Sequence, residues 1–392
     1  MAGVAELVHR GDLDELVRAV DVAASRRDFD EVLALRRACL DAVEFSGRQL
    51  WGPAAYAAYR LVLEAPVELA VDTLLVAQDR HTLGPLTEVV AQHHAWTDLA
   101  GMLPPGPVSG TVAVERVLRG DDLGDDPRAE THHLDVPPRR VPWEGPAPVV
   151  EYRARDVLSP APVPVPVGPA VDPGPPGPPI DDPELVQAWE VLVAPWATSP
   201  DGRVDVAVAD GPAPAAVAHL APGVRLRPVA LPDVVALVTW AASSGGALQR
   251  RRGGAAGRSA TWWALRVLVG HEPWSPPDEL HDDLSDWSWY VFDGPSPAPR
   301  TDGDESAAQG GWSLRLAGQH PDGWSLAIDA HDPPPDDLVL PVAEDDDPVA
   351  SVSATDDEDD LDPWAALDRA IRDVAEHDDE PASGPRQRQD DP

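Results

Sequence analysis

The sequence contains no lysine and no asparagine, so all 30 of its basic residues are arginine. Without lysine the chain has no P-loop lysine, no Schiff-base lysine and no lysine general base, which argues against Walker-type ATPases and kinase-like enzymes. Cys39 is the single cysteine, which excludes an intrachain disulfide and a multi-cysteine zinc site and suits a reducing cytoplasm. Because Cys39 lies in the helix-like stretch "LALRRACLDAV", we expect a buried structural thiol rather than a nucleophile.

Long apolar runs are also missing. No stretch approaches the ~18–20 uninterrupted apolar residues of a membrane span, and the N-terminus "MAGVAELVHRGDLDELV" lacks the basic and then apolar order of a signal peptide. We therefore expect a cytoplasmic protein with no membrane partner. The formal net charge of −38 argues against general nucleic-acid binding, which needs a basic face.

Residues 1–120 have the pattern of a helical domain. In "DLDELVRAVDVAAS", apolar residues recur at helical spacing after Asp12, which is placed to cap the helix, with Glu15 at the capping-box position. Further segments of the same kind are separated by brief turns, an arrangement typical of stacked helical pairs in α-solenoids. The sequence shows no clean repeat in support of a solenoid.

The composition changes after residue 120. Residues 121–183 are polar and then proline-rich, which indicates a linker, with one strand-like segment at "VVEYRAR". Residues 184–331 form a second folded region, in which "RVDVAVAD" and "GVRLRPVAL" alternate with helical segments, an order consistent with a parallel pair of strands. Three antiparallel candidates follow: "WSWYVFD", "GWSLRLA" and "GWSLAID". The turn residues "GQHPDG" join the last two in a hairpin.

Residues 332–392 carry 21 Asp and Glu against four Arg, so we expect a disordered acidic tail. Within it, residues 363–376 place apolar side chains on one face of a short helix that is too short to be stable alone. This set is the candidate for docking to a partner, on another protein or on this chain: Trp364, Leu367, Ile371 and Val374. The predicted fold class is α+β overall, with an all-α N-terminal domain, a C-terminal α+β domain with a small mixed sheet, and the tail.

The most unusual stretch is "GGALQRRRGGAAGRSATWWALRVLVG", which begins at residue 245. A glycine-rich loop next to a helix start, flanked by arginines, is a physically sensible anion site, with Ser259 as the expected N-cap. The candidate anion-binding residues are Arg250, Arg251, Arg252, Arg258 and Ser259. The alternative is that the small residues let two helices pack closely, while the arginines stay solvated or pair with local acids.

Other patterns give no catalytic residue. The stretch "HEPWSPPDELHDDLSDW" gathers histidine and carboxylates, but it has neither HExxH nor EF-hand spacing. No G-x-S-x-G elbow occurs, and no serine has a visible base partner. We therefore predict no metal site and no cofactor. The segment from "AASSGG" through the arginine and glycine residues to "GWSLRLA" resembles uncharacterised proteins of GC-rich actinobacteria, and this resemblance implies no activity.

We expect a non-enzymatic protein-interaction or regulatory protein whose acidity favours a basic protein partner. The alternative is a small-anion or nucleotide-binding protein, or an enzyme, that uses the loop 250–259. A third hypothesis is a role as an immunity protein or inhibitor, in which the acidic protein masks a basic partner, since the charge permits it.

Overall fold

The computed structural model describes residues 4–77, 81–129, 131–147, 149–159, 168–246, 250–272, 275–293 and 312–333. The predicted docking helix at 363–376 lies outside these residues. Residues 1–335 make up one compact unit, and residues 336–392 make up the other. The first unit is α+β, as predicted, with helices first and an antiparallel sheet toward its C-terminal end. Whether residues 1–120 and 184–331 are separate folding domains stays a prediction.

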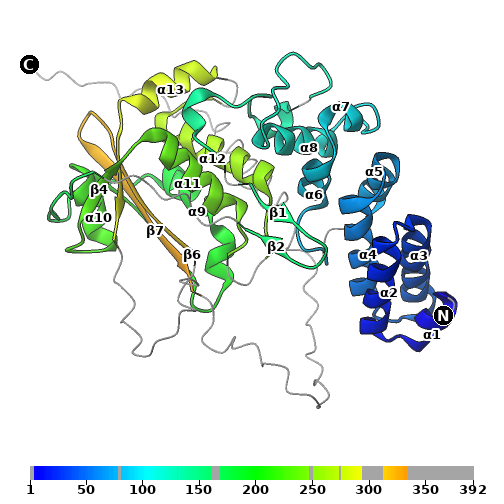
Figure 1. The fold of residues 1–392 in the computed structure, drawn as a ribbon. Helices are drawn as coiled ribbons and strands as arrows, with labels where there is room; N and C mark the ends of the chain where they lie inside the picture. The colour runs from blue at the N-terminus through cyan, green and yellow to red at the C-terminus, as the bar shows by residue number, and fades with distance from the viewer. Residues whose placement is uncertain are drawn as a thin grey trace, which may run out of the picture. The chain divides into compact units, whose positions relative to one another are not determined.

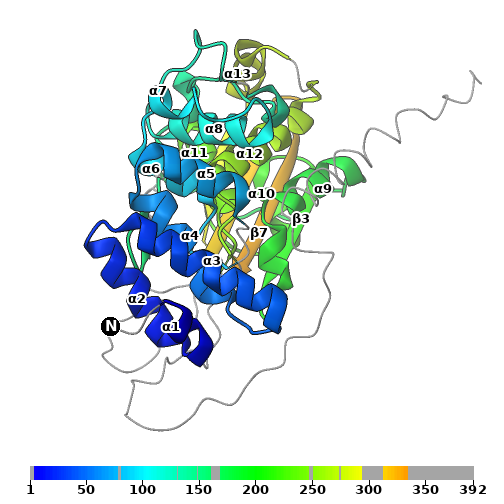
Figure 2. The same ribbon diagram turned by 90° about the vertical axis from the view of Figure 1, so that its right-hand side faces the viewer.

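In the described part of the chain, eight helices precede the sheet; α1 to α6 pack in succession, α7 packs on α5, and α8 packs on α6 (Figures 1 and 2). They are α1 (Val4–Arg10), α2 (Leu13–Ser25), α3 (Phe29–Ser46), α4 (Trp51–Glu64), α5 (Val67–Val76), α6 (Leu86–His93), α7 (Trp96–Leu99) and α8 (Pro107–Leu118). The predicted cap is confirmed, because the Asp12 carboxylate accepts a hydrogen bond from the backbone N–H of Glu15 at 2.9 Å. Cys39 is buried within α3, and burial raises the pKa of its thiol to about 11.

The segment between residues 131 and 159 contains short regular elements that pack on the helices. They are the 3₁₀ helices η1 (His132–Leu134) and η2 (Pro142–Glu144) and the two-residue strands β1 (Glu151–Tyr152) and β2 (Val157–Leu158). The Tyr59 hydroxyl donates to the carbonyl oxygen of Arg153, and the Gln92 side chain exchanges hydrogen bonds with the backbone of Tyr152. These contacts fix β1 against α4 and α6.

The remaining elements form a five-stranded sheet with helices on both faces. The helices are α9 (Pro183–Leu192), η3 (Ala194–Thr198), α10 (Ala213–Leu220), α11 (Leu231–Ser243), α12 (Gly254–Val269) and α13 (Pro277–Ser285). The strands are β3 (Arg203–Asp210), β4 (Leu226–Val229), β5 (Ser288–Phe292), β6 (Trp312–Gln319) and β7 (Trp324–Asp332). Helix α10 covers one face, and α9 and α11 cover the other (Figure 1). Among the described helices, none combines the length and the apolar character needed to cross a membrane.

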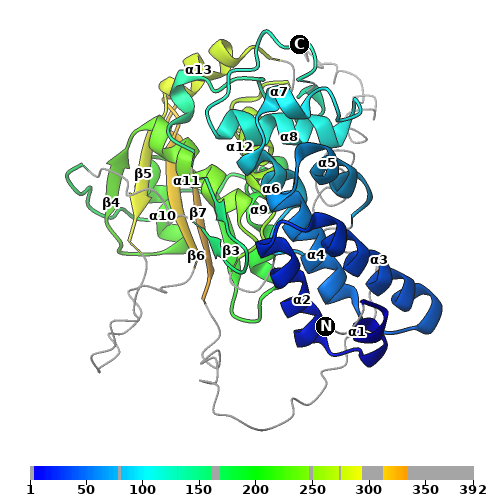
Figure 3. The ribbon, with the colours of Figure 1, turned by 45° about the vertical axis from the view of Figure 1, so that its right-hand side comes forward.

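The strand order is β3-β7-β6-β5-β4, and every neighbouring pair is antiparallel. The expected pairing of β3 with β4 is therefore wrong, as is the mixed sheet. The three later strands lie between β3 and β4, which become the two edges, and β4 lies beside β5 in Figure 3. Sequence order suggested a local pair, but β3 pairs with β7 and β4 pairs with β5, so the backbone hydrogen-bonding edges that would have joined β3 to β4 are taken by later strands.

The predicted hairpin of β6 and β7 is confirmed. Its register pairs Leu314 with Ala330 and Leu316 with Ile328, and all four side chains are buried. The turn is closed by the N–H of His320, which donates to the carbonyl oxygen of Trp324 at 2.9 Å. Gly323 has a φ of 92°, a backbone conformation that disfavours any residue with a Cβ.

Candidate functional site

The arginine and glycine stretch lies where α12 begins against α11. Helix α12 starts at Gly254, so the prediction of Ser259 as its N-cap is wrong, and the cap position is Gly253, with a φ of 102°. A Cβ at Gly257 would lie 2.0 Å from the Ser243 hydroxyl oxygen and 2.7 Å from the carbonyl oxygen of Thr239. The small residues therefore allow α12 to approach α11 closely, as the packing alternative expects.

Two buried glutamates meet the N-terminus of α12. The N–H of Gly254 donates to Glu88 Oε1 at 3.2 Å, and the N–H of Ala255 donates to Glu115 Oε1 at 2.6 Å. Glu88 lies on α6 and Glu115 lies on α8, and each is 1 % exposed. The exposed N–H groups and the dipole of a helix N-terminus attract anions. Here the anions are carboxylates of the same chain.

Arg251 completes this cluster, which we call the glutamate clasp: Glu88, Glu115, Arg251, Arg119 and Tyr152. The Arg251 guanidinium donates two hydrogen bonds of 2.9 Å to the two oxygens of Glu88. Glu88 also accepts from the Tyr152 hydroxyl at 2.6 Å, and Glu115 accepts from Arg119 at 3.1 Å. The clasp therefore joins α6, α8 and β1 to the start of α12.

The two carboxyl groups of the clasp differ in their acidity. Burial raises the pKa of Glu115, the negative charge of Glu88 raises it further, and it reaches about 7. Burial would also raise the pKa of Glu88, but the charge and hydrogen bonds of Arg251 outweigh burial and lower it. Glu88 is thus the carboxylate that stays ionised, while Glu115 takes up a proton near neutral pH.

The other predicted anion ligands lie in separate internal contacts. The Arg258 guanidinium is buried and pairs with both oxygens of Glu144 on η2, at 2.6 and 3.0 Å. The hydroxyl of Ser259 donates to the carbonyl oxygen of Leu134 at 2.8 Å. Both contacts tie α12 to residues 134–144.

Arg252 donates to the carbonyl oxygens of Val191 (3.3 Å) and Leu192 (3.0 Å) at the C-terminal end of α9. Burial lowers its pKa to about 10. Arg250 is half-buried at the start of the same described segment. The structure therefore distributes Arg251, Arg252 and Arg258 over three internal contacts and does not gather them in one surface patch.

Sequence reasoning missed the acidic partners of these arginines. The sequence signal was a single glutamate in an apolar helix: Glu88 in "LTEVVAQ" and Glu115 in "TVAVERV". A carboxylate at such a position needs a buried partner.

In the acidic stretch after α12, His271 Nε2 lies 2.6 Å from Asp283 Oδ2. Within the described ranges, no three His, Cys, Asp or Glu side chains are grouped to hold a metal ion.

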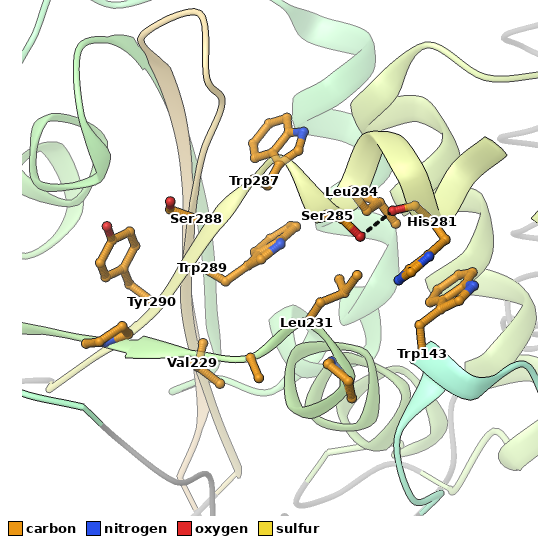
Figure 4. A pocket seen from close by; sticks show the side chains of 13 residues that line it. Trp143, Val229, Leu231, His281, Leu284, Ser285, Trp287, Ser288, Trp289 and Tyr290 are labelled. Atoms are coloured by element: carbon orange, nitrogen blue, oxygen red, sulfur yellow. Dashed lines mark hydrogen bonds between the residues drawn. The ribbon is translucent and has the colours of Figure 1, made fainter. Parts of the chain in front are cut away.

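A second feature is a hollow of 390 Å³ beside the β4–β5 edge of the sheet (Figure 4). It lies between β4, β5, η2, the start of α11 and α13, and we call it the tryptophan hollow. Its lining residues are Trp143, Pro228, Val229, Ala230, Leu231, Pro232, His281, Leu284, Ser285, Trp287, Ser288, Trp289 and Tyr290. The rings of Trp143 and His281 are stacked, with centroids 6.0 Å apart, and those of Trp287 and Trp289 are stacked at 5.6 Å.

The four predicted docking residues of the tail, Trp364, Leu367, Ile371 and Val374, lie outside the described residues. Comparison with curated proteins and with solved structures gives no match. A family model described as "Family of unknown function (DUF6183)" matches residues 14–328. Since the match extends from α2 to β7 and covers most of the chain, the protein belongs to DUF6183, a family of unknown function.

Proposed function

We propose that the protein acts in the cytoplasm as a non-enzymatic interaction or regulatory protein that binds another protein. The observation that carries the proposal is a pair of exposed aromatic side chains where α3 turns into α4. Phe45 is 78 % exposed and Trp51 is 40 % exposed. Single exposed apolar residues are ordinary, but large aromatic side chains are the kind of anchor that dominates protein interfaces, and these two flank one short connection between helices.

The connection between α3 and α4, which these two residues flank, is well fixed. Gly47 ends α3 in the left-handed conformation, with a φ of 63°, and its N–H donates to the carbonyl oxygen of Val43. Arg48 donates to the carbonyl oxygen of Val8 at 2.9 Å, which ties the turn to α1. A fixed turn loses little conformational freedom on binding, which favours affinity.

The net charge of −38 would speed the approach of a basic partner. The tail segment 363–376 is a second proposed docking element, through Trp364 and its neighbours. The relationship to proteins of GC-rich actinobacteria is likewise a proposal. It is supported by the missing lysine and asparagine, which fit a GC-rich coding sequence.

The alternative function is a small-anion or nucleotide binder, or an enzyme, that uses loop 250–259. Arg251 and Arg258 already pair with Glu88 and Glu144, so an external anion would have to displace buried carboxylates. This cost favours the interaction role.

The test is partner capture with two matched double variants. Phe45→Ser/Trp51→Ser removes the aromatic pair, and Met102→Ser/Val108→Ser removes two other exposed apolar side chains. We expect the first variant to lose at least tenfold in affinity for a captured partner, since each anchor contributes ~1–2 kcal/mol or more. The second variant should bind as the wild type does. Equal binding by both variants, or no partner for the wild type, would contradict the proposal.

A further inference from the structure

Residues 168–180, at the proline-rich end of the predicted linker, run from the β4 edge of the sheet past α10 to the β3 edge, and we call them the proline strap. At the β4 edge, the N–H of Val171 donates to the carbonyl oxygen of Leu226 at 2.7 Å. At the β3 edge, the N–H of Ile180 donates to the carbonyl oxygen of Val208 at 2.9 Å. The strap is therefore held against the sheet near both of its ends.

The sequence of the strap imposes a polyproline II helix. The stretch "DPGPPGPP", which begins at Asp172, contains five prolines, whose rings fix φ at about −65°. Each of its other three residues precedes a proline, which restricts that residue to extended or polyproline II conformations. A polyproline II helix has three residues per turn, so every third residue lies on the same face.

Glycine occupies the face of this helix that lies toward the rest of the chain. A Cβ at Gly174 would lie 3.1 Å from the Cβ of Pro214 on α10. A Cβ at Gly177 would lie 2.0 Å from the carbonyl oxygen of Asp210 at the end of β3. These two glycines are one polyproline II turn apart, and they allow the strap to lie close to α10 and β3.

The two other faces of the helix carry proline rings. One face aligns every third residue from 172, the other every third residue from 173, and both have the P-x-x-P spacing. All the prolines of the stretch are exposed, whereas both glycines are partly buried: Pro173, Pro175, Pro176, Pro178 and Pro179. Domains that recognise such segments bind exposed prolines in aromatic-lined grooves, and they gain affinity because the polyproline II helix is already formed.

Acidic side chains flank the exposed prolines. Asp172 precedes them, and its side chain is 88 % exposed although its carboxylate lies 3.8 Å from the Arg225 guanidinium. Asp181 follows them and is also exposed. A groove with basic residues at its rim complements these charges, whereas an acidic rim repels them.

We propose that the proline strap is a ready-formed ligand for a protein domain that binds polyproline II helices in an aromatic-lined groove with a basic rim. This surface shares no residue with the α3–α4 connection that carries the proposed function. Failure of either binding test therefore leaves the other proposal standing.

The experiment measures binding of the full chain to a panel of purified SH3, WW and EVH1 domains by calorimetry. We expect panel members with a basic rim to bind with a Kd of about 100 μM or tighter. Members with an acidic rim should bind about tenfold more weakly or not at all.

Pro175→Ala/Pro176→Ala removes one ring from each exposed face of the strap, and we expect it to weaken binding at least tenfold. Pro104→Ala/Pro105→Ala is the matched control, because both pairs begin the same tetrapeptide, "PPGP", and all four prolines are exposed. In the control the tetrapeptide leads into α8, which begins at Pro107, so this variant should bind as the wild type does. The thermal unfolding midpoint of each variant checks that it folds.

Two further measurements do not depend on the prolines of the strap being replaced. Asp172→Asn/Asp181→Asn changes only exposed side chains, and it should weaken binding to the basic-rim domains about threefold. A free peptide of residues 172–181 should bind more weakly than the full chain, because it is not held in the bound conformation. The proposal is overturned if no panel member binds the wild type, if the Pro175/Pro176 variant binds as the wild type does, or if the peptide binds more tightly than the chain.

Discussion

Replacing Glu88 by glutamine removes the charge that the buried Arg251 faces. The substitution keeps the size of the side chain and leaves one oxygen that can accept from Gly254 or Tyr152. It destroys the paired hydrogen bonds of 2.9 Å and leaves a buried guanidinium without its counter-charge. Loss of one partner of a buried ion pair costs about 3–5 kcal/mol. We expect the free energy of unfolding to fall by that amount.

Glu115→Gln is the matched control, because it makes the same chemical change in a neighbouring residue of equal burial. The glutamine oxygen can still accept the hydrogen bond from the N–H of Ala255, and Arg119 keeps its hydrogen bond to the backbone carbonyl oxygen of residue 115. Because the pKa of Glu115 is raised from 4.5 to about 7, its ionised form is disfavoured in the folded state by up to about 3 kcal/mol at 1.36 kcal/mol per pKa unit. Removing this charge at pH 7.5 should therefore leave the stability within about 1 kcal/mol of the wild type or raise it.

The pH dependence follows from the two opposite shifts. A folded pKa above the unfolded value means that the contribution of Glu115 is complete below pH 4.5 and is lost as the pH rises to about 7. The lowered pKa of Glu88 has the opposite effect, and its contribution is lost as the pH falls below 4.5. The free energy of unfolding of the wild type should therefore fall between pH 5 and 7. We expect this fall to disappear in Glu115→Gln and to persist in a variant at an exposed site, such as Glu44→Gln.

The assay is guanidinium unfolding at pH 5.0, 6.0 and 7.5, monitored by circular dichroism. Midpoints are compared between proteins whose free energy of unfolding has the same slope against denaturant concentration. Equal destabilisation by Glu88→Gln and Glu115→Gln would refute the assignment of Glu88 as the ionised partner of Arg251. A wild-type stability that does not change between pH 5 and 7 would refute the raised pKa of Glu115.

Three further predictions concern the loop, the linker and the tail. Phosphate, sulfate and nucleotides should not raise the thermal unfolding midpoint of the wild type, since Arg251 and Arg258 already form ion pairs with Glu88 and Glu144. A rise that is abolished by replacing Arg250, Arg251 and Arg252 with glutamine would instead establish an anion site. A nonspecific protease should cut between residues 159 and 180 and leave fragments near 1–120 and 184–331. Because the glutamate clasp joins these fragments, we expect them to elute together in gel filtration. Separate elution of the fragments, or no cut in this range, would contradict the prediction. The isolated tail should give random-coil backbone chemical shifts. When tail-less protein is added, residues 363–376 should show helical shifts, and a tail with Trp364→Ala should show no such shifts. Sharp, unchanged peaks would exclude docking on this chain.

Local patterns were sufficient where one stretch of sequence contains all the atoms of a feature. The Asp12 cap of α2 and the β6–β7 hairpin are of this kind, since each depends on residues a few positions apart. The start of α12 was not predicted correctly, because the groups that cap it come from distant segments. Ser259 is a good capping residue in isolation, but the helix extends back to Gly254, because carboxylates from α6 and α8 satisfy its first N–H groups.

The sequence by itself determined the α+β class, the burial of Cys39 and the absence of lysine chemistry, because composition and periodicity are properties of the chain alone. Only the tertiary structure decided what the arginines do. Glu88 and Arg251 are 163 positions apart, and Glu144 and Arg258 are 114 apart. The desolvation of a charge depends on which distant segments cover it, so the same arginines that suggest an exposed anion site become internal ion pairs once α6, α8 and η2 pack on α12.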